Sequence, residues 1–124
     1  MTSENPTTIV PAAAVLSRWH DHEWHHGVNL ADLHALDRVT VRTEHSVYEI
    51  IVSAPSTGDV LVRGGAFFPE FTAARFAGST LGGSFLKLRS IHTGFRLEFG
   101  LGRHYVLTSP VRTFAVCQDV SVAG

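Results

Sequence analysis

The spacing of hydrophobic positions along the chain changes near Asp37. Downstream of this residue the period is two, since Val39, Val41 and Thr43 alternate with polar neighbours, as in a strand with one buried face. Clusters of turn-forming residues follow at 54–58 and at 100–103, where we expect a hairpin loop. Further alternating or apolar runs lie at 48–52, 60–62, 75–79, 85–88, 91–99, 105–108 and 111–116. The pattern predicts six or seven short strands in this part of the chain.

Upstream of Asp37 the pattern favours helix. Pro11 suits the first position of a helix, where a missing N–H costs nothing, and Gly27 suits a left-handed stop. We therefore expect a helix over 11–26 and a short second helix over 29–36, with Leu30, Leu33 and Leu36 packing inward.

These elements predict one mainly β domain, a small barrel with an N-terminal helix. The chain has 124 residues, a typical length for a single domain, and its 11 glycines suit the tight corners of a small barrel. We expect a flexible N-terminus at 1–10, a helical segment at 11–36, the β-barrel domain at 37–118 and a tail at 119–124.

Several local motifs within residues 37–116 resemble small bacterial proteins of uncharacterised function. The expected architecture, a helix followed by a strongly bent small barrel, also resembles Sm-like and SH3-like folds. The resemblance implies a small β-barrel and carries no activity with it. The motifs are Thr43-x-x-Ser46-x-Tyr48, Arg63-Gly64-Gly65, Gly78-Ser79-x-x-Gly82-Gly83-Ser84-x-Leu86-Lys87, Ile91-x-x-Gly94 and Thr108-Ser109-Pro110-Val111.

Charge and cysteine content limit which binding partners and which cellular compartment we expect. Ten basic and 11 acidic residues give a net charge of −1, which does not favour a nucleic-acid partner. No apolar run approaches the length of about 20 residues that crosses a bilayer, so we expect no membrane partner. Cys117 is the single cysteine, and the only charge before the apolar residues 9–16 is Glu4. These features favour the cytoplasm over export, and we expect Cys117 to be a buried, inert thiol.

The sharpest chemical motif is H-E-x-x-H at His22, Glu23 and His26. On a helix, His22 and His26 share one face and could both bind Zn²⁺, with Glu23 as the general base on a zinc-bound water. Asp32 follows at the spacing of a third ligand, with Asn29 between them. This extended motif is similar to that of metzincin-like zinc proteases, which implies a zinc-dependent hydrolase.

Other features of the chain oppose zinc catalysis. Those proteases have a sheet before the motif helix and a methionine turn after it, whereas only 21 residues precede His22 and the only methionine is Met1. A polar, histidine-rich helix end is the simpler interpretation, since protonated histidine suits a helix C-terminus. No cofactor is therefore expected, and zinc is the alternative.

A dense aromatic segment at 65–71 contains Phe67, Phe68 and Phe71, in an expected loop. These side chains would either plug the end of the barrel or form a contact between subunits, because clustered exposed aromatic residues mark interfaces. The glycine-rich stretch 78–84 would be either an anion cradle or, as we favour, a bulged connection between strands.

Four arginines are candidates for a basic face on the barrel. They would suit a nucleic acid, but alternation makes Arg96 a neighbour of Glu98, and such mixed charge is typical of a solvated surface. The four residues are Arg63, Arg89, Arg96 and Arg103.

The sequence favours a non-enzymatic binding or assembly module that forms a homo-oligomer. Open small barrels leave strand edges that need partners, and the segment 67–71 offers apolar contact area. The alternative is a zinc-dependent hydrolase that uses His22, Glu23, His26 and Asp32. Neither hypothesis identifies a small-molecule ligand.

The metal content of untagged protein separates these two hypotheses. We expect substoichiometric, weakly held zinc, and we expect His22→Ala to change the free energy of unfolding by less than about 0.5 kcal/mol, as surface substitutions usually do. One equivalent of zinc that resists mild chelation would instead indicate a catalytic site. In that case Glu23→Gln should keep the metal and lose hydrolase activity, because the general base is not a ligand.

Overall fold

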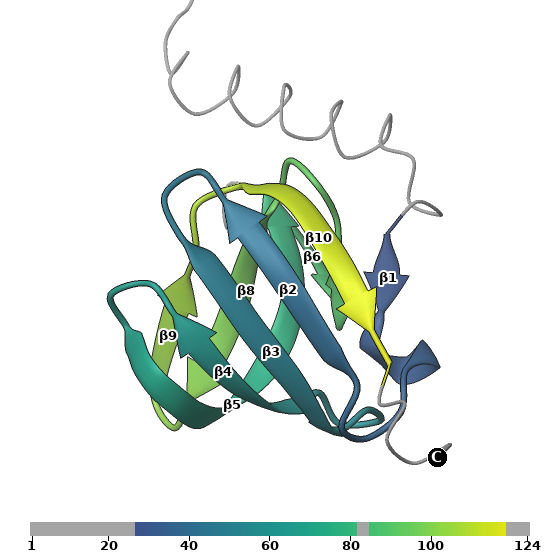
Figure 1. Ribbon diagram of the computed structural model, residues 1–124. Helices are drawn as coiled ribbons and strands as arrows, with labels where there is room; N and C mark the ends of the chain where they lie inside the picture. Colours follow the sequence, from purple (N-terminus) through teal and green to yellow (C-terminus); the bar gives the residue numbers. More distant parts are fainter. Residues whose placement is uncertain (1–26, 82–84, 119–124) are drawn as a thin grey trace, which may run out of the picture.

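The computed structural model describes residues 27–81 and 85–118. This part of the chain is mainly β, as predicted (Figure 1). Its strands are β1 (Val28–Asn29), β2 (Arg38–Thr43), β3 (Val47–Ala54), β4 (Asp59–Gly64), β5 (Phe68–Leu81), β6 (Phe85–Leu88), β7 (Ser90–Ile91), β8 (Arg96–Leu101), β9 (His104–Leu107) and β10 (Val111–Cys117). The helix expected over 11–26 and the tail at 119–124 lie outside the described residues.

Strands β2 and β3 follow the alternation that the sequence predicts. In β2, Val39, Val41 and Thr43 are buried and the residues between them are exposed. The antiparallel register places Val39 opposite Ile50 and Val41 opposite Tyr48, so one face of both strands is apolar. Removing this face from water is the main favourable contribution to folding.

Strand β5 pairs with different strands along its two halves. Its first half pairs with β4, which extends the antiparallel series β10-β2-β3-β4. From Arg75 onward it pairs with β8, and β6 joins it on the side that β4 has left. The sequence predicts a loop at 65–71 and a strand only at 75–79. That prediction holds for the turn at 65–67 but is wrong for 68–71, because β5 is continuous for 14 residues from Phe68.

A bulge bends β5 where its neighbour on one side changes from β4 to β6. The register against β8 shifts between Phe76 and Gly78, and the carbonyl oxygen of Ala77 accepts a hydrogen bond from the Arg89 N–H instead. Gly78 has a φ of 145°, and a Cβ at this position would overlap the carbonyl oxygen of Lys87. Glycine therefore allows β6 to approach the bend.

The aromatic centre of the core joins the two halves of β5. The ring centroid of Phe99 in β8 lies 5.6 Å from that of Phe68 and 5.4 Å from that of Phe76. All three side chains are fully buried. Contact at these distances is favourable for aromatic pairs, so the core holds the bent strand in its folded course.

The expected small barrel is not closed, since the sheet remains open. Within the described residues its strand order begins at β10 and ends at β9. The Gly94 N–H donates to the Val111 carbonyl oxygen and the Val111 N–H donates to that of Phe95, and these bonds connect β10 to the segment before β8. The sheet stays open because the chain crosses at Pro110 after β9 and then pairs, as β10, with β2.

The short helix expected over 29–36 is also wrong. Only a 3-10 turn, η2 (Leu30–Asp32), forms there. The Leu36 N–H donates to the Val52 carbonyl oxygen rather than to a helical partner, which ties the segment to β3. Leu30 and Leu33 do pack against the core, whereas Leu36 is 61% exposed.

Replacing Gly78 with alanine should destabilise the fold more than the same change at Gly102. Both glycines have positive φ, 145° and 58°. The left-handed value at Gly102 costs an alanine on the order of 1–2 kcal/mol, and the value at Gly78 lies in a region that glycine alone adopts readily. A Cβ at Gly102 meets open space, but at Gly78 it overlaps the backbone of Lys87. We expect Gly78→Ala to lower the free energy of unfolding by at least about 1 kcal/mol more than Gly102→Ala. Urea unfolding followed by circular dichroism measures both; equal losses would contradict the role of the β5–β6 contact.

Candidate functional site

The two ends of the open sheet are strand edges of unequal length. Edge strand β9 has four residues and pairs with β8, and edge strand β10 has seven and pairs with β2. Figure 1 shows β10 beside β2, across the fold from β9. Beyond Val111, no described segment pairs with the outer side of β10. An edge of this kind presents free backbone donors and acceptors to another strand.

The side chains of β10 divide between the two faces of the sheet. Phe114 lies opposite Val41 and Val116 opposite Val39, so both belong to the core face. Phe114 packs against the core, but Val116 remains 38% exposed because β10 ends the sheet. The opposite face carries exposed residues, namely Thr113, Ala115 and Cys117.

Arg112 is the only charged residue of β10, and Glu44 pairs with it. The distance from the Arg112 guanidinium to the Glu44 carboxylate is 3.3 Å. Proteins commonly protect a sheet edge with charged side chains, lysine above all, or with proline. In β10, one paired arginine stands at the start of the strand and the next five residues are uncharged. The edge therefore lacks charge that would repel another strand.

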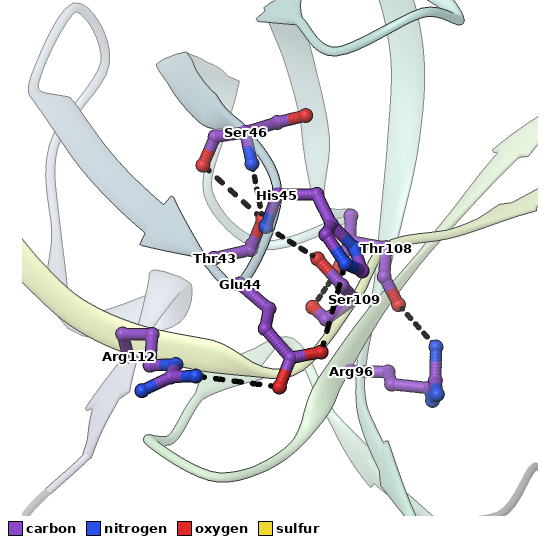
Figure 2. Close-up of polar contacts among 8 residues, drawn as sticks. All are labelled: Thr43, Glu44, His45, Ser46, Arg96, Thr108, Ser109 and Arg112. Carbon is purple, nitrogen blue, oxygen red and sulfur yellow. Dashed lines mark hydrogen bonds and ion pairs between the residues drawn. The ribbon is translucent and has the colours of Figure 1, made fainter.

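Polar contacts hold the start of β10 beside the turn between β2 and β3 (Figure 2). The Glu44 N–H donates to the Pro110 carbonyl oxygen at 3.1 Å, and the His45 N–H donates to the Ser109 hydroxyl at 3.3 Å. The Thr108 hydroxyl donates to the Ser109 carbonyl oxygen. These bonds fix the crossing from β9 to β10, and so they position the exposed edge.

The same turn does not form a hydrolytic triad. The Nε2 atom of His45 lies 3.9 Å from Glu44, and both side chains are well exposed. His45 meets Ser109 through its backbone N–H rather than through its ring. A base must reach the nucleophile's proton through its side chain, so this arrangement is structural.

A cluster of charged side chains covers Phe71 on the outer face of the sheet. The Arg63 guanidinium carbon lies 4.4 Å from the centre of the Phe71 ring, and Arg63 also donates hydrogen bonds to Glu49. Arg38 donates to the same carboxylate at 3.2 Å. The hydrogen bond from Arg63 is the main cause that lowers the pKa of Glu49, and the charges of both arginines add to it.

The fold places the three phenylalanines of the predicted interface in different surroundings. Phe67 is 66% exposed in the turn before β5 and remains available to a partner. Phe68 is fully buried against Phe99, so its side chain cannot contact a partner in this fold. Phe71 is half-buried beneath Arg63. Alternation within a strand separates these neighbours, since successive side chains point to opposite faces.

The predicted zinc ligands are only partly described. His22, Glu23 and His26 lie outside the described residues, whereas Asp32 is exposed in the turn η2. Within 27–81 and 85–118, no three His, Cys, Asp or Glu side chains gather as a metal site would require. The zinc site therefore stays a prediction.

The remaining predicted sites are the four arginines and the glycine-rich stretch 78–84. Arg63 binds Glu49, and Arg96 donates to the Thr108 carbonyl oxygen at 3.1 Å, so neighbours hold two of the four arginines. Arg89 follows β6, and Arg103 lies in the β8–β9 turn. Gly78 stands at a bulge, but residues 78–81 belong to strand β5 rather than to a connection, and 82–84 lie outside the described residues.

Cys117 was expected to be a buried thiol, and this is wrong. Its side chain is exposed on β10. The sequence around it is apolar, but only the strand order shows that β10 is an edge.

A groove of about 580 Å³ lies at the corner between β4, β5 and the β8–β9 hairpin. Asp59 and Arg75 form an ion pair of 3.5 Å on its wall. The Thr57 hydroxyl also donates to Asp59, and this hydrogen bond is the main cause that lowers the pKa of that carboxyl. The remaining lining is mostly small, including Ala73, Gly100 and Gly102.

Sequence reasoning missed the edge of β10 as a candidate site. The available signal was the run 111–116, which is rich in β-forming residues and contains one charge. Comparison of the chain with protein-family models, curated proteins and solved structures found no match. Among the residues that the structure describes, there is no helix with the length and apolar character to cross a membrane.

Replacing Arg63 should raise the pKa of Glu49 more than replacing Arg38, because the Arg63 hydrogen bond is the largest cause that lowers it. We expect the pKa in Arg63→Gln to move toward the ordinary value of 4.5, with a smaller rise in Arg38→Gln. Carboxyl titration by NMR measures both variants, and the reverse order would contradict the assignment. Since folding lowers this pKa, the stabilisation from Glu49 is complete above the ordinary value and is lost as pH falls through the lowered one.

Proposed function

We propose that the protein is a non-enzymatic binding or assembly module that forms homo-oligomers in the cytoplasm. The observation that carries this proposal is the edge of β10, which lacks a described partner beyond Val111 and has no unpaired charge. An exposed, uncharged edge strand is a ready template for pairing with another chain. The single cysteine suits a reducing compartment.

Exposed apolar side chains on β9 and in the turn before β5 support assembly. Tyr105 on β9 is 76% exposed and Leu107 is 45% exposed, and these two residues share one face of that strand. Phe67 lies at the start of β5 with 66% of its surface exposed. Large apolar side chains that gather on a surface are typical of interaction sites. The Sm-like or SH3-like resemblance remains part of the proposal, as an open and strongly bent sheet of related design.

Light scattering of the full chain tests the proposed assembly. The chain mass is 13.5 kDa, and we expect a measured mass of twice this value or more at micromolar concentration, because unpaired edges bring copies together. The mass should fall on dilution, as mass action requires. A mass of one chain at every concentration up to 100 µM, about the upper end of ordinary assays, would contradict the proposal.

A further inference from the structure

Edge strand β10 suits a second copy of the chain better than edge strand β9 does. It is longer, with seven residues against four, and very short edge strands are one way in which proteins prevent pairing. The start of β10 is already held by Phe95 and Gly94 through Val111. The free part of the edge therefore runs from Arg112 to Cys117, with Gln118 following.

We propose that two copies of the chain pair antiparallel along β10, about a two-fold axis at Ala115, and join their sheets. This inference rests on the proposed homo-oligomer and names the surface that forms it. A two-fold axis brings the same strand of each copy together, so the edge must be complementary to itself. The side chains of β10 meet this condition.

The faces of the strands decide where the axis lies. Directly opposed residues of an antiparallel pair point to the same face, so the axis must pass through a residue rather than between two. With the axis at Ala115, Phe114 lies opposite Val116 of the second copy, and this apolar pair occurs twice. An axis at Phe114 would instead place Arg112 opposite Val116. The register at Ala115 matches apolar side chains with each other.

The polar face of the strand also accepts this register. Thr113 would lie opposite Cys117 of the second copy, and small alanine side chains would meet at the axis. On this face, Arg38 and Arg42 belong to β2. Arg38 would lie three strand spacings from Arg42 of the second copy, about 14 Å, which is beyond the screening length of about 10 Å at 0.1 M salt. Charge repulsion across the joint is therefore weak.

Cysteine cross-linking tests the axis directly. In a Cys117→Ser background, Ala115→Cys places a thiol on the axis, where opposed Cα atoms lie about 4.5–5.5 Å apart, within disulfide range. The matched control is Thr40→Cys in the same background. Thr40 is exposed and directly opposite Ala115 on β2, but its counterpart would be about 14 Å away. We expect mild oxidation to give a covalent dimer with Ala115→Cys and none with Thr40→Cys.

A second variant tests the same surface without a thiol. Ala115→Lys leaves the fold intact, because Ala115 is exposed, but it opposes two positive charges at the axis. We expect the dissociation constant of the dimer to rise by about tenfold or more, since opposed like charges disfavour strand pairing. Thr40→Lys on β2, which is also exposed, is the control and should leave it unchanged. Circular dichroism confirms that both variants are folded.

The outcomes separate this inference from the proposed function. Cross-linking at Ala115 together with dissociation by Ala115→Lys supports both. An oligomer that Ala115→Lys leaves intact, with no more cross-linking at Ala115 than at Thr40, overturns pairing along β10 and retains the oligomeric module. A monomer at every concentration overturns both.

Discussion

The bend in β5 is the constraint on which the rest of the structure depends. A straight strand of 14 residues would extend one sheet and leave its apolar face in water. The bulge before Gly78 turns the second half toward the first, so Phe99 packs between Phe68 and Phe76. One backbone irregularity thereby allows the two halves of a single strand to enclose one common core.

The same arrangement determines which edges stay open. The chain crosses from β9 to β10 at Pro110, where the turn 44–46 holds it (Figure 2). After this crossing β10 pairs with β2, and β9 has no further strand beside it in the described part of the chain. The exposed edges are thus a consequence of connectivity, and the proposed assembly would use one of them.

The surface of this fold is built to hold charges in pairs. Glu49 lies between Arg38 and Arg63, Asp59 contacts Arg75, and Glu44 contacts Arg112. Exposed pairs of this kind contribute little to stability, about 0–1 kcal/mol each, but they leave few free charges along β10. Backbone pairing and apolar contact would then decide which partner binds.

The sequence by itself determined the strands whose side chains alternate and the hairpin at 100–103, because a period of two is a local property of a half-buried strand. It did not show that 68–81 form one strand, since Pro69 and the bulge at Gly78 interrupt the local pattern. It left Phe68 open between a plug of the barrel end and a subunit contact and expected Cys117 to be buried, whereas in the fold Phe68 is fully buried and Cys117 is exposed. Whether a side chain is buried depends on which strand lies beside it and on which strand ends the sheet. Only the tertiary structure decides that order, because it comes from pairing between residues far apart in the chain.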